Sequence, residues 1–519
     1  MALALSAATL TGCATSSPTE QASADGAQQG GTVQIALPDD PTCIDPQQTG
    51  QRNALEIVRG VVDSLTDQDP ETGEIRPWLA ESFTVSEDAR EFRFTLRPDV
   101  TFSDGTPVEA EAVQSTFDWL AEQPASGAAA YIQGYTGTEI EDPLNLTVGF
   151  EQPNAQFLQA TAGTSFGILS PASAGADLAA RCRGEFIGSG PFVVQSYTPD
   201  QDAVITRRDD YAWPSSLATN PGAAHLDEVR FLFVPEDGAR AAALESGQID
   251  VSETVQLADQ PRFDGNGFSL LTTINPGAAP PLSPNHDGVL GDTDVRRAIL
   301  LGIDREELVR TVFGPEGRVA TGVLSSTTPF YVDQSAEVRY DPTEAAALLD
   351  GAGWVPGPDG IRVRDGVPLR LVWLIPFAAQ PENEQVQQQL RRLGIDVVLD
   401  VVTAPVYVER QDRGDFDFTA VDVSRADPDV LRNLFLSTGP NLWGLPGGEL
   451  DTFLERQAGL ADSAQRQEAV DGAVRLLIEG AHTIPLYETR LVHGVTDDVR
   501  DLRLDASLRL TLHDAWRTG

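Results

Sequence analysis

The sequence contains no lysine, so all 36 of its basic side chains are arginines. Against them stand 78 aspartates and glutamates, which gives a formal net charge of −42. This excess of negative charge excludes nucleic acid as a partner, because its phosphates would be repelled. Codon bias in a GC-rich genome is the simplest reason for the missing lysine. An acidic surface that stays soluble at high ionic strength is the alternative.

Histidine and cysteine are also scarce. No two histidines stand at a metal-ligand spacing such as i, i+4, so we predict no metal site and no cofactor. The five histidines are His225, His286, His482, His493 and His513. Of the three cysteines, Cys43 and Cys182 form an even pair once Cys13 is assigned to the chain terminus, as argued next. In an oxidising compartment they either form a disulfide or remain two buried thiols.

Long apolar runs are absent after the first residues, and none approaches the ~20 residues of a membrane span. Residues 2–10 are apolar or small, and residues 10–13 (LTGC) form a lipobox. In that pattern Gly12 precedes the cleavage site and Cys13 becomes the lipid-carrying N-terminus. Residues 14–31 are rich in Ser, Thr, Gln, Ala and Gly and are predicted to be a flexible tether.

The lipobox predicts an exported protein that is held by lipid at the extracytoplasmic face of the membrane, in the cell envelope or periplasmic space. The alternative is a chance cysteine after an apolar run. No basic residue precedes that run, which leaves open where the signal peptide starts.

Hydrophobic periodicity indicates alternating strands and helices, so the predicted class is α/β. Strands are predicted at residues 32–37, 83–85, 91–96, 203–207, 369–374 and 395–402. Helices are predicted at residues 53–65, 106–120, 236–247, 295–302 and 383–393, with more between 450 and 480. Asp294 and Asp304 are predicted N-caps, and Glu307 would complete a capping box with Asp304.

Seven sequence blocks, in a fixed order, carry a family resemblance. The longest begins with TGEIRPWLAESF at residues 72–83 and continues with FRFTLR at 92–97 and VTFSDGTPV at 100–108. The others are GSGPF (188–192), RDDYAW (208–213), LESGQID (244–250), DVRRAI (294–299), IDRE (303–306) and the block from YDP (340–342) to Trp354. Together they resemble the family 5 extracytoplasmic solute-binding proteins of peptide and nickel ABC importers. Phe83 stands where that family usually has tryptophan.

The resemblance implies a two-lobe periplasmic-binding-protein clamshell with an extra domain. Lobe one would combine residues 32–60, 188–268 and 487–519, the extra domain would be residues 61–187, and lobe two residues 269–486. A monomer would bind its ligand in the cleft, close by a hinge motion, and deliver the ligand to ABC permease and ATPase subunits. Such a protein is not an enzyme.

Residues 421–429 (VDVSRADPD) are the segment predicted to contact ligand. In the family's peptide binders, the aspartate three residues before the Asp-Pro pair binds the peptide α-amine. Ser424 stands at that position, before Asp427, and a hydroxyl cannot neutralise an ammonium group. Arg425, which follows, is suited to hold a carboxylate or phosphate instead. The alternative is that Arg425 only pairs with Asp422 or Asp427.

Two aromatic residues complete the predicted site. Trp443 stands in a loop where an aromatic side chain often lines a ligand cavity, although core packing is an equal alternative. Tyr331, after a Thr-Pro turn, is a comparable candidate. The predicted ligand-binding set is therefore Ser424, Arg425, Asp427, Trp443 and Tyr331.

Two glycine-rich motifs offer other chemistry. Residues 163–167 (GTSFG) match the G-x-S-x-G nucleophile elbow, but that motif needs a strand before the serine and a helix after it. Residues 188–190 (GSG) precede a proline and a strand, so they are interpreted as a crossover between domains, not as a phosphate loop.

A sensor or chaperone lipoprotein on the same fold is the alternative function. The sequence does not distinguish a peptide, a modified peptide, a metal chelate or a sugar as ligand.

Overall fold

The computed structural model describes residues 26–518 except 124–125, 127 and 422. The predicted lipobox with Cys13 lies outside these residues. Across the described part of the chain, no helix combines the length and apolar character needed to cross a membrane. Three sheets organise the fold, and each has its own hydrophobic core. Below, lobe one, the extra domain and lobe two denote the parts built on the seven-, four- and five-stranded sheets. The residue boundaries given above for these parts stay a prediction.

Lobe one is built on a mixed sheet of order β12-β25-β11-β1-β10-β9-β8. Its strands are β1 (Thr32–Leu37), β8 (Phe192–Thr198), β9 (Asp202–Arg207), β10 (Glu228–Phe233), β11 (Val251–Ser252), β12 (Phe268–Ile274) and β25 (Arg490–Thr496). β1 pairs in parallel with β10 and β11, and the other pairs are antiparallel. The chain end returns to β1, where Arg517 Nη1 donates to the carbonyl of Thr32 at 3.0 Å.

Helix α1 (Arg52–Val58) is shorter than the predicted helix over residues 53–65. It ends because the next carbonyls are taken by a distant segment: Gly60 O accepts from the N–H of Phe192, and Val61 O from that of Gly190, both at 2.9 Å. A Cβ on Gly190 would lie 2.5 Å from the carbonyl carbon of Val61. Close backbone approach therefore explains the glycines of this crossover.

The sulfur atoms of Cys43 and Cys182 are bonded at 2.02 Å, which ties the chain after β1 to the end of α6 (Leu178–Cys182). Beside the disulfide, Arg181 Nε lies 2.7 Å from Asp45 Oδ2, and both side chains are fully buried. A covalent bond and a buried ion pair thus join lobe one to the segment that precedes the crossover.

The extra domain is built on the antiparallel sheet β4-β5-β7-β6. Its strands are β4 (Ala80–Val85), β5 (Glu91–Leu96), β6 (Tyr135–Asp142) and β7 (Asn145–Phe150). Its helices are α2 (Ala110–Ala121), α3 (Ala129–Ile132), α4 (Phe157–Ala160) and α5 (Pro171–Ala174), with the 3-10 turn η1 (Thr164–Phe166). Edge-to-face contacts among Phe92, Phe117, Phe157 and Phe166 fill the core.

Lobe two is built on the sheet β20-β19-β21-β14-β23. Its strands are β14 (Pro281–Pro284), β19 (Arg370–Pro376), β20 (Asp396–Val402), β21 (Phe418–Thr419) and β23 (Ile484–Pro485). Its helices are α8 (Thr293–Gly302), α9 (Arg305–Val312), α10 (Pro342–Gly351), α11 (Pro381–Arg392), α12 (Ala404–Asp412), α13 (Val430–Phe435), α14 (Glu449–Ala458) and α15 (Ser463–Glu479).

The helix caps in lobe two differ from the predicted ones. Asp292, not Asp294, caps α8 by accepting the N–H of Asp294 at 2.9 Å. Asp304 caps α9 as predicted and accepts the N–H of Glu307 at 2.8 Å. The capping box is incomplete, because the Glu307 side chain instead pairs with Arg392.

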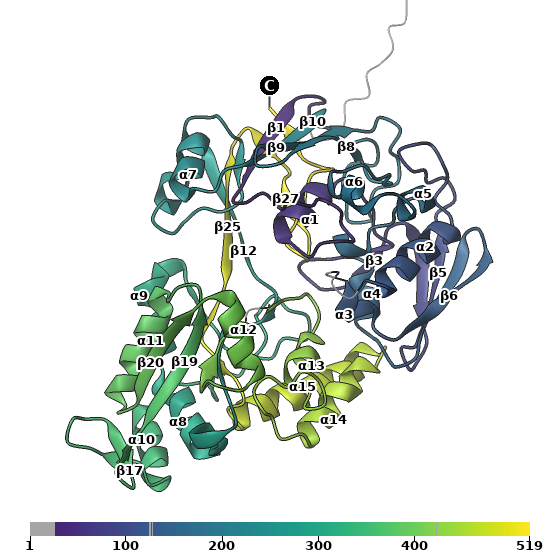
Figure 1. Cartoon of the computed structure of the whole chain (residues 1–519). Helices are drawn as coiled ribbons and strands as arrows, with labels where there is room; N and C mark the ends of the chain where they lie inside the picture. Colours follow the sequence, from purple (N-terminus) through teal and green to yellow (C-terminus); the bar gives the residue numbers. More distant parts are fainter. Residues whose placement is uncertain (1–25, 124–125, 127, 422, 519) are drawn as a thin grey trace, which may run out of the picture.

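Two long neighbouring strands connect the lobes. β12 leaves lobe one and β25 returns to it, paired along their whole length from Phe268 opposite Thr496 to Ile274 opposite Arg490. Figure 1 shows β25 running from the sheet at the top of the molecule down toward lobe two, with β12 beside it. A two-strand connection of this kind can bend while both lobes stay rigid.

Candidate ligand-binding site

A cavity of about 490 Å³ lies where the three parts meet. Lobe one contributes residues from α1 and from the loop between β27 (Arg503–Leu504) and β28 (Leu510–Thr511). The extra domain contributes α3, α4 and η1, and lobe two contributes the segment around β22 (Val423–Ser424). The volume falls within the range typical of small-molecule sites.

Ser424 and Arg425, two of the residues predicted to contact ligand, line this cavity. Their position is set by β13 (Gly277–Ala278), which pairs with β22. Gly277 has φ +125°, and a Cβ there would lie 2.1 Å from the carbonyl oxygen of Val423. The N–H of Arg425 donates to Pro276 O at 2.9 Å, and Ser424 Oγ to Asn275 Oδ1 at 2.5 Å. The glycine thus allows the close strand pairing that holds both residues at the cavity wall.

The Arg425 side chain crosses from lobe two to the extra domain. Its guanidinium carbon lies 4.3 Å from the ring centroid of Tyr131, and Nη1 donates to Gln156 Oε1 at 3.3 Å. Nε is buried and has no hydrogen-bond partner among the described residues. Asp427, one of the two acids considered as its partner, pairs elsewhere, and Asp422 lies outside the described residues. Arg425 therefore keeps donors for an additional acceptor.

The other three predicted ligand residues lie outside the cavity lining. Asp427 is 4% exposed and receives two hydrogen bonds from Arg466, at 3.0 and 2.7 Å. Trp443 is 1% exposed in the core of lobe two, where Nε1 donates to Thr419 Oγ1 at 2.8 Å. We therefore assign both residues structural roles.

Tyr331 is half-buried, and its hydroxyl lies 2.5 Å from Thr321 Oγ1. Packing and internal hydrogen bonds thus account for the positions of Asp427, Trp443 and Tyr331.

Sequence reasoning missed two cavity arginines, Arg52 and Arg509, which stand near opposite ends of the chain. Arg52 Nε donates to Glu253 Oε1 at 2.6 Å. Behind them Glu56 is fully buried and accepts the N–H of Leu510 at 2.8 Å. Burial, and next the nearby Glu253 carboxylate, raise the pKa of Glu56 to about 8. No local motif marks these residues, because only the fold brings them together.

The G-x-S-x-G segment also lines the cavity, but not as a nucleophile elbow. Thr164 to Phe166 form the 3-10 turn η1 after helix α4, so the strand-to-helix geometry of an elbow is missing. Thr164 Oγ1 is buried without a hydrogen-bond partner in the described structure. The turn supplies small polar groups to the cavity wall.

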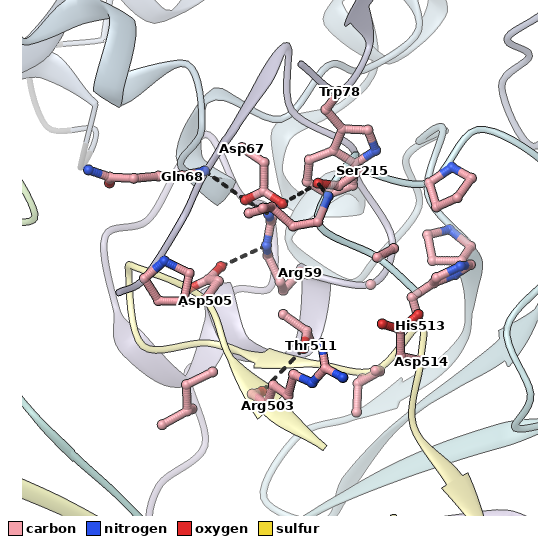
Figure 2. A pocket seen from close by; sticks show the side chains of 18 of the residues that line it. Arg59, Asp67, Gln68, Trp78, Ser215, Arg503, Asp505, Thr511, His513 and Asp514 are labelled. Carbon is pink, nitrogen blue, oxygen red and sulfur yellow. Dashed lines mark hydrogen bonds and ion pairs between the residues drawn. The ribbon is translucent and has the colours of Figure 1, made fainter. Parts of the chain in front are cut away.

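A second cavity of about 380 Å³ lies between the extra domain and the C-terminal segment of lobe one (Figure 2). Several of its charged groups already have partners. Arg59 Nε lies 2.8 Å from Asp505 Oδ2, and its guanidinium carbon lies 4.6 Å from the ring centroid of Trp78. Asp67 accepts a hydrogen bond from Ser215. Arg59 and Asp505 thus neutralise each other, and the described lining of this cavity carries acidic as well as basic side chains.

Two histidines far apart in sequence meet in lobe two: His286 Nε2 lies 2.7 Å from His482 Nδ1. Burial lowers the pKa of His286 to about 4 and that of His482 to about 3. In the part of the chain that the structure describes, no group of three or more His, Cys, Asp or Glu side chains could hold a metal ion. The pair is therefore interpreted as a neutral packing contact.

The sequence model of the bacterial extracellular solute-binding proteins, family 5, matches residues 74–443. The chain belongs to this family. Binding a solute outside the cytoplasm is thus its role.

The names of known relatives state different ligands. The probable D,D-dipeptide-binding periplasmic protein of Escherichia coli K12 is 26% identical over 487 residues, which cover 89% of each chain. The nickel-binding periplasmic protein of the same strain is 26% identical over 347 residues, 63% of each chain. The crystal structure of NikA from Brucella suis in complex with Fe(III)-EDTA superposes with a TM-score of 0.82 at 23% identity, covering 94% of this chain and 100% of that one. Family membership alone therefore leaves the ligand open.

Proposed function

We propose that this protein captures an organic solute with an anionic group in the cavity between its lobes and delivers it, as a monomer, to an ABC permease. The observation that carries the proposal is the charge of the cavity wall. In a chain of net charge −42, the described cavity lining contains Arg52, Arg425 and Arg509 but no aspartate or glutamate.

Arg425 is the residue proposed to bind the anionic group directly. It follows Ser424, the position where peptide binders of this family carry an amine-binding aspartate. A guanidinium presents a planar fork of donors to a carboxylate or phosphate, whereas it repels an ammonium group. Its contact with Tyr131 holds the fork at the junction of the lobes. An anion bound there would touch both sides of the closing cleft.

The test compares two peptides that differ in one charged group. Ala-Ala-Ala amide carries an ammonium group at its N-terminus, and its N-succinyl derivative carries a carboxylate in that place. We expect calorimetric titration to show tighter binding of the succinyl peptide, and the free-amine peptide to bind no tighter than about millimolar. Replacing Arg425 with alanine should remove the difference, with a loss of roughly 2–5 kcal/mol. Micromolar binding of the free-amine peptide that survives Arg425→Ala would refute the proposal.

We propose further that closure moves lobe two, residues 269–486, against lobe one and the extra domain with the boundaries predicted from the sequence. Two contacts support this, since they join lobe two to the extra domain without passing through the connecting strands. Gln68 Nε2 donates to Ala426 O at 3.2 Å, and the N–H of Ala155 donates to Ala458 O at 2.8 Å. Small-angle scattering should give a larger radius of gyration for a Gln68→Ala variant without ligand than for the wild type. Identical radii of gyration would contradict the proposal that these two contacts hold lobe two against the extra domain.

The membrane anchor is proposed from the lipobox, in which Cys13 becomes the lipid-carrying residue. A Cys13→Ser variant should move from the membrane fraction to the soluble fraction, because the acyl chains of a lipoprotein supply most of its membrane affinity. Unchanged partitioning would rule out this anchor.

A further inference from the structure

The three arginines of the cavity come from two lobes, and the two groups are called its lobe-two end and its lobe-one end. Arg425 comes from lobe two, and Arg52 and Arg509 come from lobe one. The rest of the lining mixes polar side chains with apolar ones, and the apolar ones include Leu55, Ala160, Phe166, Leu491 and Leu508. A ligand that fills the cavity therefore meets arginine side chains from both lobes.

At the lobe-one end the arginines have unused donors. Arg52 begins helix α1, and its Nη2 is buried without a hydrogen-bond partner among the described residues, although Nε is bound to Glu253. Arg509 Nε is likewise buried and unpartnered in the described structure. Thr164, which also lines the cavity, adds a buried hydroxyl that lacks a partner in the described structure. These groups together offer an acceptor several hydrogen bonds.

The carboxylates behind this end compensate only part of its charge. Glu253 is bound to Arg52, and Glu56 is directed to the N–H of Leu510. Burial and the neighbouring Glu253 raise the pKa of Glu56 to about 8, so at neutral pH this carboxyl is held protonated. Asp505 also lies near Arg509, but it is paired with Arg59. Three guanidinium groups, those of Arg52, Arg59 and Arg509, then face the two carboxylates of Glu253 and Asp505, which leaves a net positive charge.

The lobe-two end is positive as well. Arg425 contacts the Tyr131 ring and the Gln156 amide oxygen, and both of these groups are neutral. A buried charge without a partner is unfavourable. An anionic group of the ligand bound at each end would neutralise the positive charge there. A ligand with a single anionic group leaves one end uncompensated.

We propose that the cavity selects organic acids with two anionic groups, one bound by Arg425 and the other by Arg52 and Arg509. This inference rests on the proposed function and names its class of solute. Because the two arginine groups belong to different lobes, such a ligand links the lobes electrostatically when the cleft closes.

The test uses two matched series in calorimetric titrations. One series contains α,ω-dicarboxylates from glutarate to suberate, and the other contains straight-chain monocarboxylates of the same lengths. At least one dicarboxylate should bind about tenfold or more tightly than its matched monocarboxylate. Arg509→Gln and Arg425→Gln should each lower the affinity for the best dicarboxylate to about that for the matched monocarboxylate. Arg456→Gln, an exposed change outside the cavity lining, is the control and should leave both affinities unchanged.

The outcomes separate this inference from the proposed function. Equal affinities for the two series contradict the two-anion proposal, and so does the absence of binding by either series below about 1 mM. If the affinities are equal but binding is lost in Arg425→Gln, the anion-binding function stands and only the second anion is refuted. Binding that is insensitive to Arg425→Gln contradicts both.

Discussion

Replacing Glu56 with glutamine should change how the stability of the protein depends on pH. Glu56 is fully buried behind the cavity, and its pKa of about 8 in the folded protein compares with an ordinary value of 4.5. Between these two pH values the folded state binds one proton more than the unfolded state. The free energy of unfolding of the wild type therefore falls as pH rises, by up to about 1.4 kcal/mol per pH unit from this group alone.

Glutamine keeps the acceptor for the N–H of Leu510 and replaces the acidic O–H by an amide, so the variant lacks this proton. Its stability minus that of the wild type should rise steadily from about pH 5 to about pH 8 in urea unfolding experiments. Glu87→Gln, an exposed change, is the control and should give a difference that does not depend on pH. A flat difference for Glu56→Gln would show that Glu56 is ionised in the folded protein, and the net charge assigned to the lobe-one end would then be wrong.

Three further changes test the packing around the site. Gly277→Ala should destabilise the protein by about 1–3 kcal/mol or more and weaken ligand binding, because its Cβ would meet a strand backbone at 2.1 Å. The control is Gly238→Ala on the exposed side of a helix, where a Cβ meets nothing within 4 Å and no destabilisation is expected. Arg466→Ala leaves the buried carboxylate of Asp427 unpaired and should cost about 3–5 kcal/mol in urea unfolding, whereas a loss below about 1 kcal/mol would refute the buried pair. Cys182→Ala should lower the free energy of unfolding by about 2–5 kcal/mol, and titration of the oxidised, unfolded wild type should find no free thiol.

The sequence predicted those elements whose pattern is local. β1 and β5 coincide residue for residue with the predicted strands at 32–37 and 91–96, because alternation of apolar and polar residues sets strand and face together. The helix predicted over 53–65 stops at Val58 although its apolar spacing continues. Its later carbonyls bind the N–H groups of Gly190 and Phe192, a competition that no local pattern reveals.

For the candidate site too, local sequence motifs were informative and long-range contacts could not be predicted. Ser424 and Arg425 were found because they stand inside a family motif, and both line the cavity. Arg52 and Arg509 belong to no motif and meet only through the return of the chain end to the first sheet. Trp443 is an aromatic residue of the kind that often lines a cavity. Packing in the core of lobe two and a hydrogen bond to Thr419 determine its position instead.

The central claim is that the arginine-lined cavity between the lobes holds an anionic solute. The most direct test purifies the protein from its native host, denatures it, and identifies the small molecules released in stoichiometric amount by mass spectrometry. The account predicts a solute with net negative charge at neutral pH, and esterification should detect two acidic groups on it. A neutral or cationic solute, such as a simple free-amine peptide, would contradict the account.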